Sequence, residues 1–415
     1  MIERHWSQNA PRDWPEVRIR DHVKLVNGFP FDSELFSTSD GWPLVRIRDI
    51  STLTTVVRYS GEFIPEAVIR KGDVLIGMDG EFNVARWQGE DALLNQRVCC
   101  LRSTASLDAR FLSYILPIPL RVINALTYST TVKHLSSFDI LKIRFRLPPK
   151  PVQHLIADFL DAETQQIDAL IAEKERMLAL LEEKWAVVAT NLATSGVVSN
   201  EHSQKTSIRW LSEISIKWKI RRAKLLFKEI DQRSETGEET LLSLRMERGL
   251  VPHNDVSEKP ILAEHLIGYK IARKNEIVLN RMRAASGLVA VAHQYGIVSP
   301  DYAVFRALDD VDPEYFALLF KTSILQAVFR SLSKGLGTGE SGFLRLYSED
   351  FLNIKLPVPP FGEQKAIVAE LARQRARTAE VEETLAESIK LLKERRVALI
   401  AAAVTGQIEP EAMTA

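Results

Sequence analysis

The feature that most constrains the fold is an internal repeat. Residues 143–194 match residues 354–405 at a constant offset of 211 positions, without a gap. The matched positions are a double proline, a glutamine, a threonine and a series of apolar residues: Ile143/Ile354, Phe145/Leu356, Pro148-Pro149/Pro359-Pro360, Gln153/Gln364, Ile156/Ile367, Leu160/Leu371, Leu181/Leu392 and Thr194/Thr405. A repeat of this length indicates that one structural unit occurs twice in the chain. The alternative is that two unrelated helices happen to look alike.

A weaker similarity precedes each copy. Residues 71–76 resemble 274–279, residues 98–102 resemble 302–306, and residues 108–112 resemble 312–316. The first two stretches are rich in β-branched and apolar residues, which favours strands. Each half is therefore expected to contain a strand-rich domain, a double proline and a long helix, an α+β architecture with an internal pseudo-two-fold repeat. The predicted segments are a first strand-rich domain at 1–150, a helix at 151–197, a second strand-rich domain at 198–360 and a helix at 361–415.

The segments after the double prolines predict long helices. Proline is excluded from helix interiors and marks their approach, and Gly196 and Gly406 stand where a C-terminal glycine is expected. Between these signals, apolar residues recur at alternating spacings of three and four, which is typical of a coiled-coil seam. The predicted seam consists of Ile167, Ile171, Leu178, Leu181, Trp185 and Val188 in the first helix and Leu385, Ile389, Leu392, Arg396 and Leu399 in the second.

Such helices need a partner along their whole length. A helix of about 40 residues is ~60 Å long, which is more than one small domain can cover. We therefore expect the two helices to pair with each other in an antiparallel coiled coil. Two polar seam residues, Lys174 and Arg396, can fix the register of the pair. The alternative is that each helix packs on its own globular domain.

The balance of charge at first argues against a nucleic-acid ligand. The chain has 415 residues, with 54 Lys and Arg against 54 Asp and Glu, whereas nucleic-acid-binding proteins usually carry a basic excess. Divided by segment, however, residues 1–150 and 201–360 each carry a net charge of +3, and residues 151–200 carry −5. The two strand-rich domains are thus mildly basic, and the first helix is acidic.

Local clusters of basic and amide side chains nominate the DNA-binding residues. Lysine and arginine neutralise phosphates, arginine also binds guanine edges, and Asn, Gln and Asp suit other base edges. In the first domain Arg46 and Arg48 alternate along a predicted strand, and a polar loop follows at residues 78–83. The candidates in the first domain are Arg46, Arg48, Asp79, Asn83, Arg86, Gln96, Arg97, Lys133 and His134. Those in the second are Lys217, Lys219, Arg221, Arg222, Lys224, Asn280, Arg281, Arg283, Lys334 and Thr338. For each residue singly, the alternative is an ordinary solvated side chain.

No catalytic or metal motif is found in the sequence. A phosphate-binding loop with a following Lys-Ser or Lys-Thr, a paired-histidine zinc motif and a nucleophile elbow are all missing. The glycine-rich stretch 335–342 follows a predicted helix at 315–332 rather than a strand, which indicates a flexible loop near a ligand and not a dinucleotide site. The two cysteines, Cys99 and Cys100, are too few for a disulfide framework. We therefore expect a binding protein without catalytic residues, metal or cofactor of its own.

Targeting signals are missing as well. No stretch approaches ~18 consecutive apolar residues, and the first residues show no apolar core behind their basic positions. The expected setting is the cytoplasm, without a membrane.

Several strings together resemble the specificity subunit of type I restriction–modification systems. The resemblance covers essentially the whole chain, and the twice-occurring Pro-Pro-x-x-x-Gln step into a long helix is its most specific part. The strings are Leu147-Pro148-Pro149 with Gln153 and Ile156, Pro359-Pro360 with Glu363-Gln364 and Ile367, residues 72–83, Leu94-Asn95-Gln96-Arg97-Val98, and Val404-Thr405-Gly406-Gln407-Ile408. The chain departs from the family at Val152, where the family usually has a glutamate. This departure puts the start of the first helix in question.

The resemblance implies a function. Two target recognition domains each read one half of a split, asymmetric sequence of double-stranded DNA, and the paired helices set the spacing. Two methyltransferase subunits dock on the helices and bring S-adenosylmethionine, and restriction subunits join to cleave. The alternatives are a protein–protein scaffold with a coiled-coil spacer and an enzyme with an unrecognised site.

Overall fold

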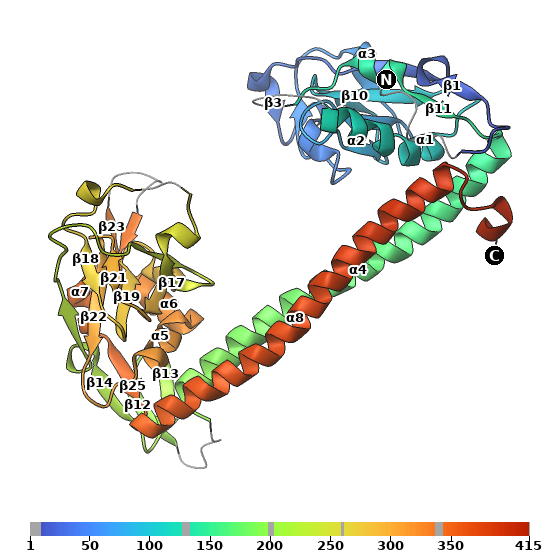
Figure 1. Cartoon of the computed structure of the whole chain (residues 1–415). Coiled ribbons are helices and arrows are strands. Elements are labelled where there is room, and N and C mark those ends of the chain that lie inside the picture. Colours follow the sequence, from blue (N-terminus) through green and yellow to red (C-terminus); the bar gives the residue numbers. More distant parts are fainter. Residues whose placement is uncertain (1–9, 127–132, 198–202, 259–260, 337–342, 415) are drawn as a thin grey trace. The chain divides into compact units, whose positions relative to one another are not determined.

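The computed structural model describes residues 10–126, 133–197, 203–258, 261–336 and 343–414 (Figure 1). The chain forms two compact units. Unit 1 contains residues 1–174 and 387–415, and unit 2 contains residues 175–386. Each unit therefore combines a strand-rich domain with the beginning of one long helix and the end of the other.

A four-stranded antiparallel sheet forms the frame of each unit. In unit 1 the strand order is β2 (Val23–Asn27), β10 (Val98–Ser103), β7 (Val74–Gly77) and β8 (Val84–Arg86). In unit 2 it is β15 (Phe227–Ile230), β22 (Tyr302–Ala307), β19 (Glu276–Asn280) and β20 (Val289–Val291). The register is also the same. The first residue of β10, Val98, lies opposite the last residue of β7, Gly77, and the first residue of β22, Tyr302, lies opposite the last residue of β19, Asn280. The structure thus confirms the weaker similarity found in the sequence.

The central strands are buried on both faces, as their unbroken apolar sequences require. In unit 1, Ile76 and Cys99 pack under the helices α1 (Ala109–Ile115) and α2 (Pro117–Leu126). Leu75 and Cys100 face the other way, against a second sheet. Successive strand residues point to opposite faces, so the adjacent cysteines belong to two different cores. Burial raises the pKa of the Cys99 thiol to about 12 and that of Cys100 still further.

The two units differ in their additional strands. Unit 1 has a five-stranded sheet in the order β3 (Phe36–Ser37), β5 (Arg58–Tyr59), β4 (Trp42–Val45), β9 (Ala92–Leu94) and β6 (Val68–Ile69). Unit 2 has separate two-stranded pairs instead. They are β16 (Leu242–Arg245) with β17 (Gly249–Pro252), β18 (Lys270–Ala272) with β21 (Gly296–Val298), β12 (Ser203–Ile208) with β13 (Leu211–Ser215), and β23 (Lys334–Leu336) with β24 (Phe343–Arg345).

Helices cover the frame of unit 2 in the same way. α5 (Pro313–Lys321) and α6 (Ser323–Leu332) pack on its sheet through Phe316, Phe320 and Phe329. The single helix predicted over residues 315–332 was therefore wrong in one respect. Thr322 has extended backbone angles, and its side chain accepts a hydrogen bond from the amide of Leu325, which starts a new helix. A local side-chain cap of this kind competes with helix continuation.

The step from each domain into its long helix is built around a buried glutamine. A short strand pair comes first, β1 (Glu16–Arg18) with β11 (Arg144–Arg146) in unit 1 and β14 (Lys219–Arg222) with β25 (Lys355–Val358) in unit 2. The Gln153 amide nitrogen donates to the Pro148 carbonyl at 2.8 Å, and its oxygen accepts from the Asp108 amide at 2.8 Å. Gln364 makes the same contacts to Pro359 and Asp312, at 2.9 and 2.7 Å. A buried amide needs such partners, which explains why glutamine recurs at this position.

The long helices are α4 (Lys150–Ser195) and α8 (Phe361–Val404). In unit 1, Arg396 of α8 contacts Asp168 of α4 at 2.9 Å. In unit 2, the Arg375 guanidinium lies 5.6 Å from the ring centre of Trp185. Within unit 1, Leu160 of α4 also shares a core with Ala403 of α8, and within unit 2, Ala193 of α4 shares a core with Ile367 of α8. In each unit, residue numbers therefore rise along α4 as they fall along α8, so the helices are antiparallel (Figure 1).

The predicted seam residues are less exposed than the positions around them. All eleven seam residues are buried or half-buried, whereas most of their neighbours in sequence are exposed. The final turn of each helix also enters a domain core, Ala403 and Val404 in unit 1 and Ala193 in unit 2. The structure therefore combines the two sequence-based alternatives: the helices pair with each other, and their ends pack on globular domains.

Candidate nucleic-acid interface

Polar side chains gather at one end of the four-stranded sheet in unit 1. This loop end consists of residues 78–83, which join β7 to β8, residues 96–97, which precede β10, and residues 133–134. Backbone hydrogen bonds tie the three segments together, since the Met78 amide donates to Arg97 and the Leu135 amide donates to Met78. Residues that are far apart in the sequence thus form one continuous surface.

Apolar anchors hold the 78–83 loop in place. Met78 and Phe82 are buried in the core. Phe82 has a positive φ of 52°, and Gly80 has one of 75°. A bulky residue in the left-handed region is unusual, and here the Phe82 ring is buried between the half-buried Asp79 and the exposed Asn83. Asn83 is exposed, and its carbonyl accepts a hydrogen bond from the Gly77 amide that closes the loop.

A carboxylate organises two basic side chains at the loop end of unit 1. Asp79 Oδ1 lies 2.8 Å from His134 Nδ1, and its Oδ2 lies 3.4 Å from the Arg97 guanidinium. The Asp79 side chain is recessed, at 18% exposure, whereas those of His134 and Arg97 are 64% and 65% exposed. Nearby, Lys133 Nζ donates to the backbone and side-chain oxygens of Asn124 at 2.8 and 3.0 Å. Gln96 is exposed beside Arg97.

The corresponding loop end of unit 2 has different chemistry. It consists of residues 281–288 after β19, residues 300–301 before β22, and residues 334 and 344–347. The Leu346 amide donates to the Arg281 carbonyl, as the Leu135 amide does to Met78 in unit 1. Arg281 itself donates to the carbonyls of Asp301 and Pro300 at 2.8 and 3.2 Å. Burial, followed by the nearby charge of Arg345, lowers the pKa of the Arg281 guanidinium.

An aromatic ring and further charges border this surface. The Arg345 guanidinium lies 3.6 Å from the Asp301 carboxylate and 5.7 Å from the ring centre of Tyr347. Lys334 Nζ lies 5.6 Å from the same ring and 3.1 Å from Asp350. An open cavity of about 430 Å³ is lined by Arg281, Lys334 and Tyr347, together with acidic residues. Arg283, two residues after Arg281, is exposed.

Arg46 and Arg48 lie beside the loop end of unit 1 and not on a strand. Strand β4 ends at Val45, and residues 47–49 form a single 3₁₀ turn, so the strand predicted here was wrong. Asp49 explains the turn, because its carboxylate accepts from the Arg46 amide and pairs with the Arg46 guanidinium at 3.4 Å. A side chain added at Gly77 would meet Ile47 at 3.1 Å, which places this turn beside the end of β7. Arg48 is exposed.

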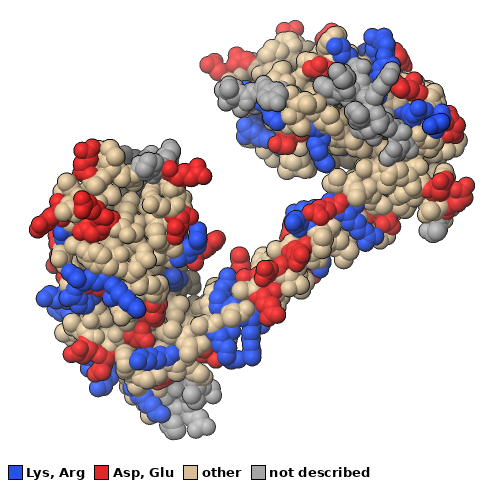
Figure 2. Space-filling view, in the orientation of Figure 1, with Lys and Arg blue, Asp and Glu red and all other residues tan. Residues whose placement is uncertain are grey.

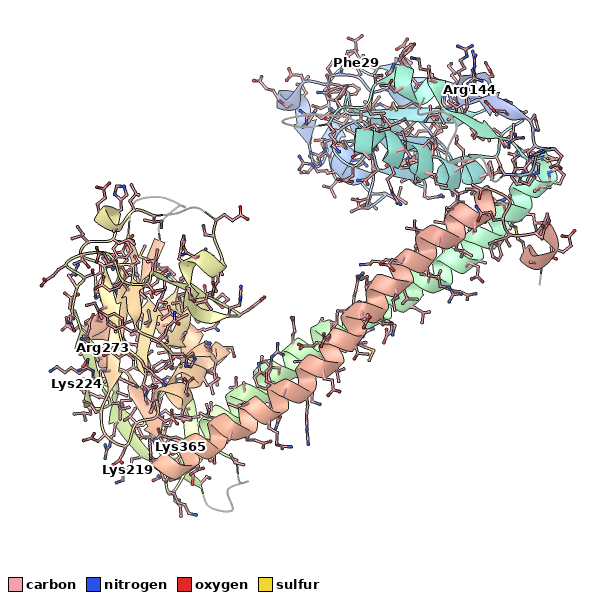
Figure 3. All side chains as sticks on the ribbon, viewed as in Figure 1. Phe29, Arg144, Lys219, Lys224, Arg273 and Lys365 are labelled. Atoms are coloured by element: carbon pink, nitrogen blue, oxygen red, sulfur yellow. The ribbon has the colours of Figure 1, made fainter. Side chains whose placement is uncertain are left out.

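Several candidates lie elsewhere. Arg86 is opposite Val74, at the other end of the sheet from Asp79. The basic cluster of unit 2 lies on or beside β14, which pairs with β25 immediately before α8: Lys217, Lys219, Arg221, Arg222 and Lys224. Figure 3 shows Lys219 and Lys224 at the margin of the domain. These residues are exposed, yet they are remote from Arg281 along the sheet.

Other candidates are occupied by the fold. Asn280 is buried, and its side-chain oxygen accepts from the amides of Met282 and Arg283. Lys270, part of a basic cluster in the sequence, is 4% exposed and lies 3.3 Å from Asp231 and 3.8 Å from Glu229. Thr338 lies outside the described residues.

Sequence reasoning missed three residues at the loop end of unit 2, namely Asp301, Arg345 and Tyr347. The repeat itself contains the signal for two of them. The offset of 204 positions that aligns residues 98–102 with 302–306 also aligns Arg97 with Asp301. The offset of 211 positions that aligns the long helices also aligns His134 with Arg345. Extending the repeat from the strands to the positions beside them was enough to find them.

Charge on the visible face of unit 2 is uneven. Figure 2 shows Lys and Arg side chains gathered near the middle of this domain, with Asp and Glu side chains on both sides of them. Among the described residues, none of the helices is both long and apolar enough to cross a membrane. Within the same part of the chain, no group of His, Cys, Asp and Glu side chains is arranged to hold a metal ion.

Comparisons with known proteins agree with this architecture. A family model for the type I restriction modification DNA specificity domain matches residues 11–178 and 260–391. The specificity subunit of the type I restriction enzyme EcoBI from Escherichia coli is 28% identical, over 95% of this chain and 86% of that protein. The MjaVIII specificity subunit from Methanocaldococcus jannaschii is 23% identical, over 96% of this chain and 94% of that protein.

One solved structure is similar over nearly the full length. It comes from a study of complex assembly and conformational transition in a type I R-M system, and it superposes with a TM-score of 0.67. The superposition covers 96% of this chain and 99% of the other at 18% identity, so it shows the fold.

Proposed function

This chain belongs to the family of type I restriction–modification DNA specificity subunits, and from that premise we propose that each of its two domains reads one half of a split DNA sequence. The observation that carries the proposal is the pair of loop ends. They occupy the same position in the same four-stranded frame, yet they present different polar side chains. This combination suits two different half-sites, because hydrogen-bonding side chains at base edges distinguish the bases and a shared frame presents them in the same way in both domains.

The surface of each loop end suits a major-groove edge. Arg97, His134 and Asn83 in unit 1, and Arg283, Lys334 and Asp301 in unit 2, are exposed and lie on or beside short loops. Arginine, asparagine and aspartate are side chains that pair with base edges. The basic cluster at β14 is placed to neutralise phosphates, which contributes affinity without sequence preference.

We assign the helices two roles, setting the separation between half-sites and docking partner subunits. α4 carries a stripe of exposed apolar side chains along one side of its seam: Leu170, Met177, Leu180 and Val187. Such a stripe is unusual on a solvated surface and is typical of protein contacts. The partners we propose are two methyltransferase subunits, which bind S-adenosylmethionine, and restriction subunits, all acting in the cytoplasm.

The test uses the complex of this chain with its methyltransferase partner and a library of duplexes. The expected result is selection of two short specific segments separated by an unspecified spacer. Affinity should also fall steeply with salt, because phosphate neutralisation releases counterions. A complex that selects no sequence would refute the proposal, and affinity that is insensitive to salt would favour a protein–protein scaffold instead.

A further inference from the structure

Arg97 and Asp301 occupy the same place in the two frames. Arg97 directly precedes β10, and Asp301 directly precedes β22. The first residue of β10 lies opposite the last residue of β7, and the first residue of β22 lies opposite the last residue of β19. Arg97 of unit 1 and Asp301 of unit 2 are therefore structurally equivalent.

At this shared position the exposure is the same and the charge is reversed. The side chains of Arg97 and Asp301 are each 65% exposed. Each is held by a recessed partner of opposite charge, Arg97 by Asp79 at 3.4 Å and Asp301 by Arg345 at 3.6 Å. The partners are 18% and 23% exposed. In unit 1 a recessed acceptor holds an outward donor, and in unit 2 a recessed donor holds an outward acceptor.

An outward carboxylate on a DNA-binding surface restricts what it can contact. Phosphate groups repel it, so a base edge that donates hydrogen bonds is the favourable partner. Arg345 and Arg281 lie around Asp301 and offset its charge near the DNA backbone. A guanidinium has the opposite preference, and guanine, with two acceptors on its major-groove edge, is its commonest specific partner.

We propose that Arg97 reads a guanine in the first half-site and that Asp301 accepts a hydrogen bond from the amino group of a cytosine or adenine in the second. Both assignments rest on the proposed function and add the class of base to it. Asp79 and Arg345 are positioning residues that fix the direction of the outward side chain.

The experiment compares Arg97→Ala and Asp301→Ala with the unchanged chain, each in complex with the methyltransferase subunit. Binding is measured to duplexes in which every base pair of the selected sequence is changed singly. Arg97→Ala should lose about 10- to 100-fold discrimination at one guanine-containing pair of the first half-site. Asp301→Ala should lose as much at one position of the second, where the unchanged chain requires a base with a major-groove amino group; single-pair changes distinguish cytosine from adenine.

Matched controls come from the opposite end of the same strands. Arg20 is exposed beside the start of β2, which pairs with the end of β10, and Asp309 is exposed just after β22. Arg20→Ala and Asp309→Ala should leave discrimination at every position unchanged.

Two results would overturn the assignment. In the first, Arg97→Ala weakens all duplexes equally, as a phosphate contact would. In the second, the relaxed positions lack a guanine for Arg97 or an amino-bearing base for Asp301. Failure of the proposed function is a separate outcome, because the complex of the unchanged chain would then select no sequence at all.

Discussion

At the scale of single residues, the one departure from the family pattern has a structural explanation. In unit 2, Glu363 accepts a hydrogen bond from the indole N–H of Trp218 at 3.0 Å, beside Gly196 at the end of α4. In unit 1 the corresponding tryptophan is Trp14, which is buried against Gly406 at the end of α8. Val152, at the glutamate position, packs on the same apolar cluster. The first copy thus stabilises its helix start by apolar packing, and α4 is well formed without the acid.

Glu363 offers a direct test of this difference. Glu363→Val should lower the free energy of unfolding by about 1–3 kcal/mol, because it leaves the buried indole N–H of Trp218 unpaired. Glu363→Gln keeps an acceptor and should cost less than about 1 kcal/mol. Urea unfolding followed by circular dichroism measures both, with Glu380→Val, an exposed position on the same helix, as the control. Equal losses for Gln and Val would show that the indole contact is not what matters.

Side-chain burial was the least predictable property at this scale. The sequence nominated Asn280 for DNA because amide side chains suit adenine, but it gave no sign that a tight turn after β19 would use the amide internally. Lys270 is likewise basic in the sequence, but in the structure Asp231 and Glu229 lie around its buried ammonium group. The residue types of a segment indicate which polar groups are present. Whether a side chain faces solvent or the protein interior depends on contacts between distant segments.

At the scale of elements, the long helices were the most predictable part of the molecule. A spacing of three and four residues fixes which face is apolar, and the double prolines and terminal glycines fix the ends. Short elements were harder. Residues 46–49 alternate like a strand, but the Asp49 carboxylate stabilises a 3₁₀ turn. Local hydrogen bonds between side chains and the backbone determine the structure of such short segments, and the spacing of apolar residues does not reveal these bonds.

The seam predicts the effect of charges within it. Leu181→Asp or Leu392→Asp would place a carboxylate against apolar side chains of the facing helix, at a cost of about 2 kcal/mol. The helix pair should loosen, and the complex should accept half-sites at several separations instead of one. Selection from duplexes with varied spacers measures this. Leu391→Asp, one residue away and 56% exposed, should retain a single separation. Unchanged spacing and assembly in both seam variants would mean that these positions do not set the separation.

At the scale of the whole molecule, zero net charge is a sum over unlike parts. Both domains are mildly basic, and residues 151–200 are acidic. Fields of exposed charges fade within about 10 Å at moderate salt, so a DNA surface responds to its own cluster and not to the total. The division of the chain is also not linear, since unit 1 takes residues from two separate stretches of sequence and unit 2 lies between them. The four linear segments expected from the repeat stay a prediction.

Independence of the two domains is the property that a split recognition sequence requires. Arg281 and Arg283 belong to unit 2 alone, so changing both to Ala should weaken binding to the second half-site and leave selection in the first intact. If Arg283 contacts a phosphate, the slope of log affinity against log salt should fall by about one unit. Duplexes with only one half-site altered measure the effects on the two half-sites separately. The single variant Arg283→Ala distinguishes the effect of the exposed Arg283 from that of the partly buried Arg281. An equal change in selection at both half-sites would show that the domains do not act independently, because a residue of one unit would then control recognition by the other.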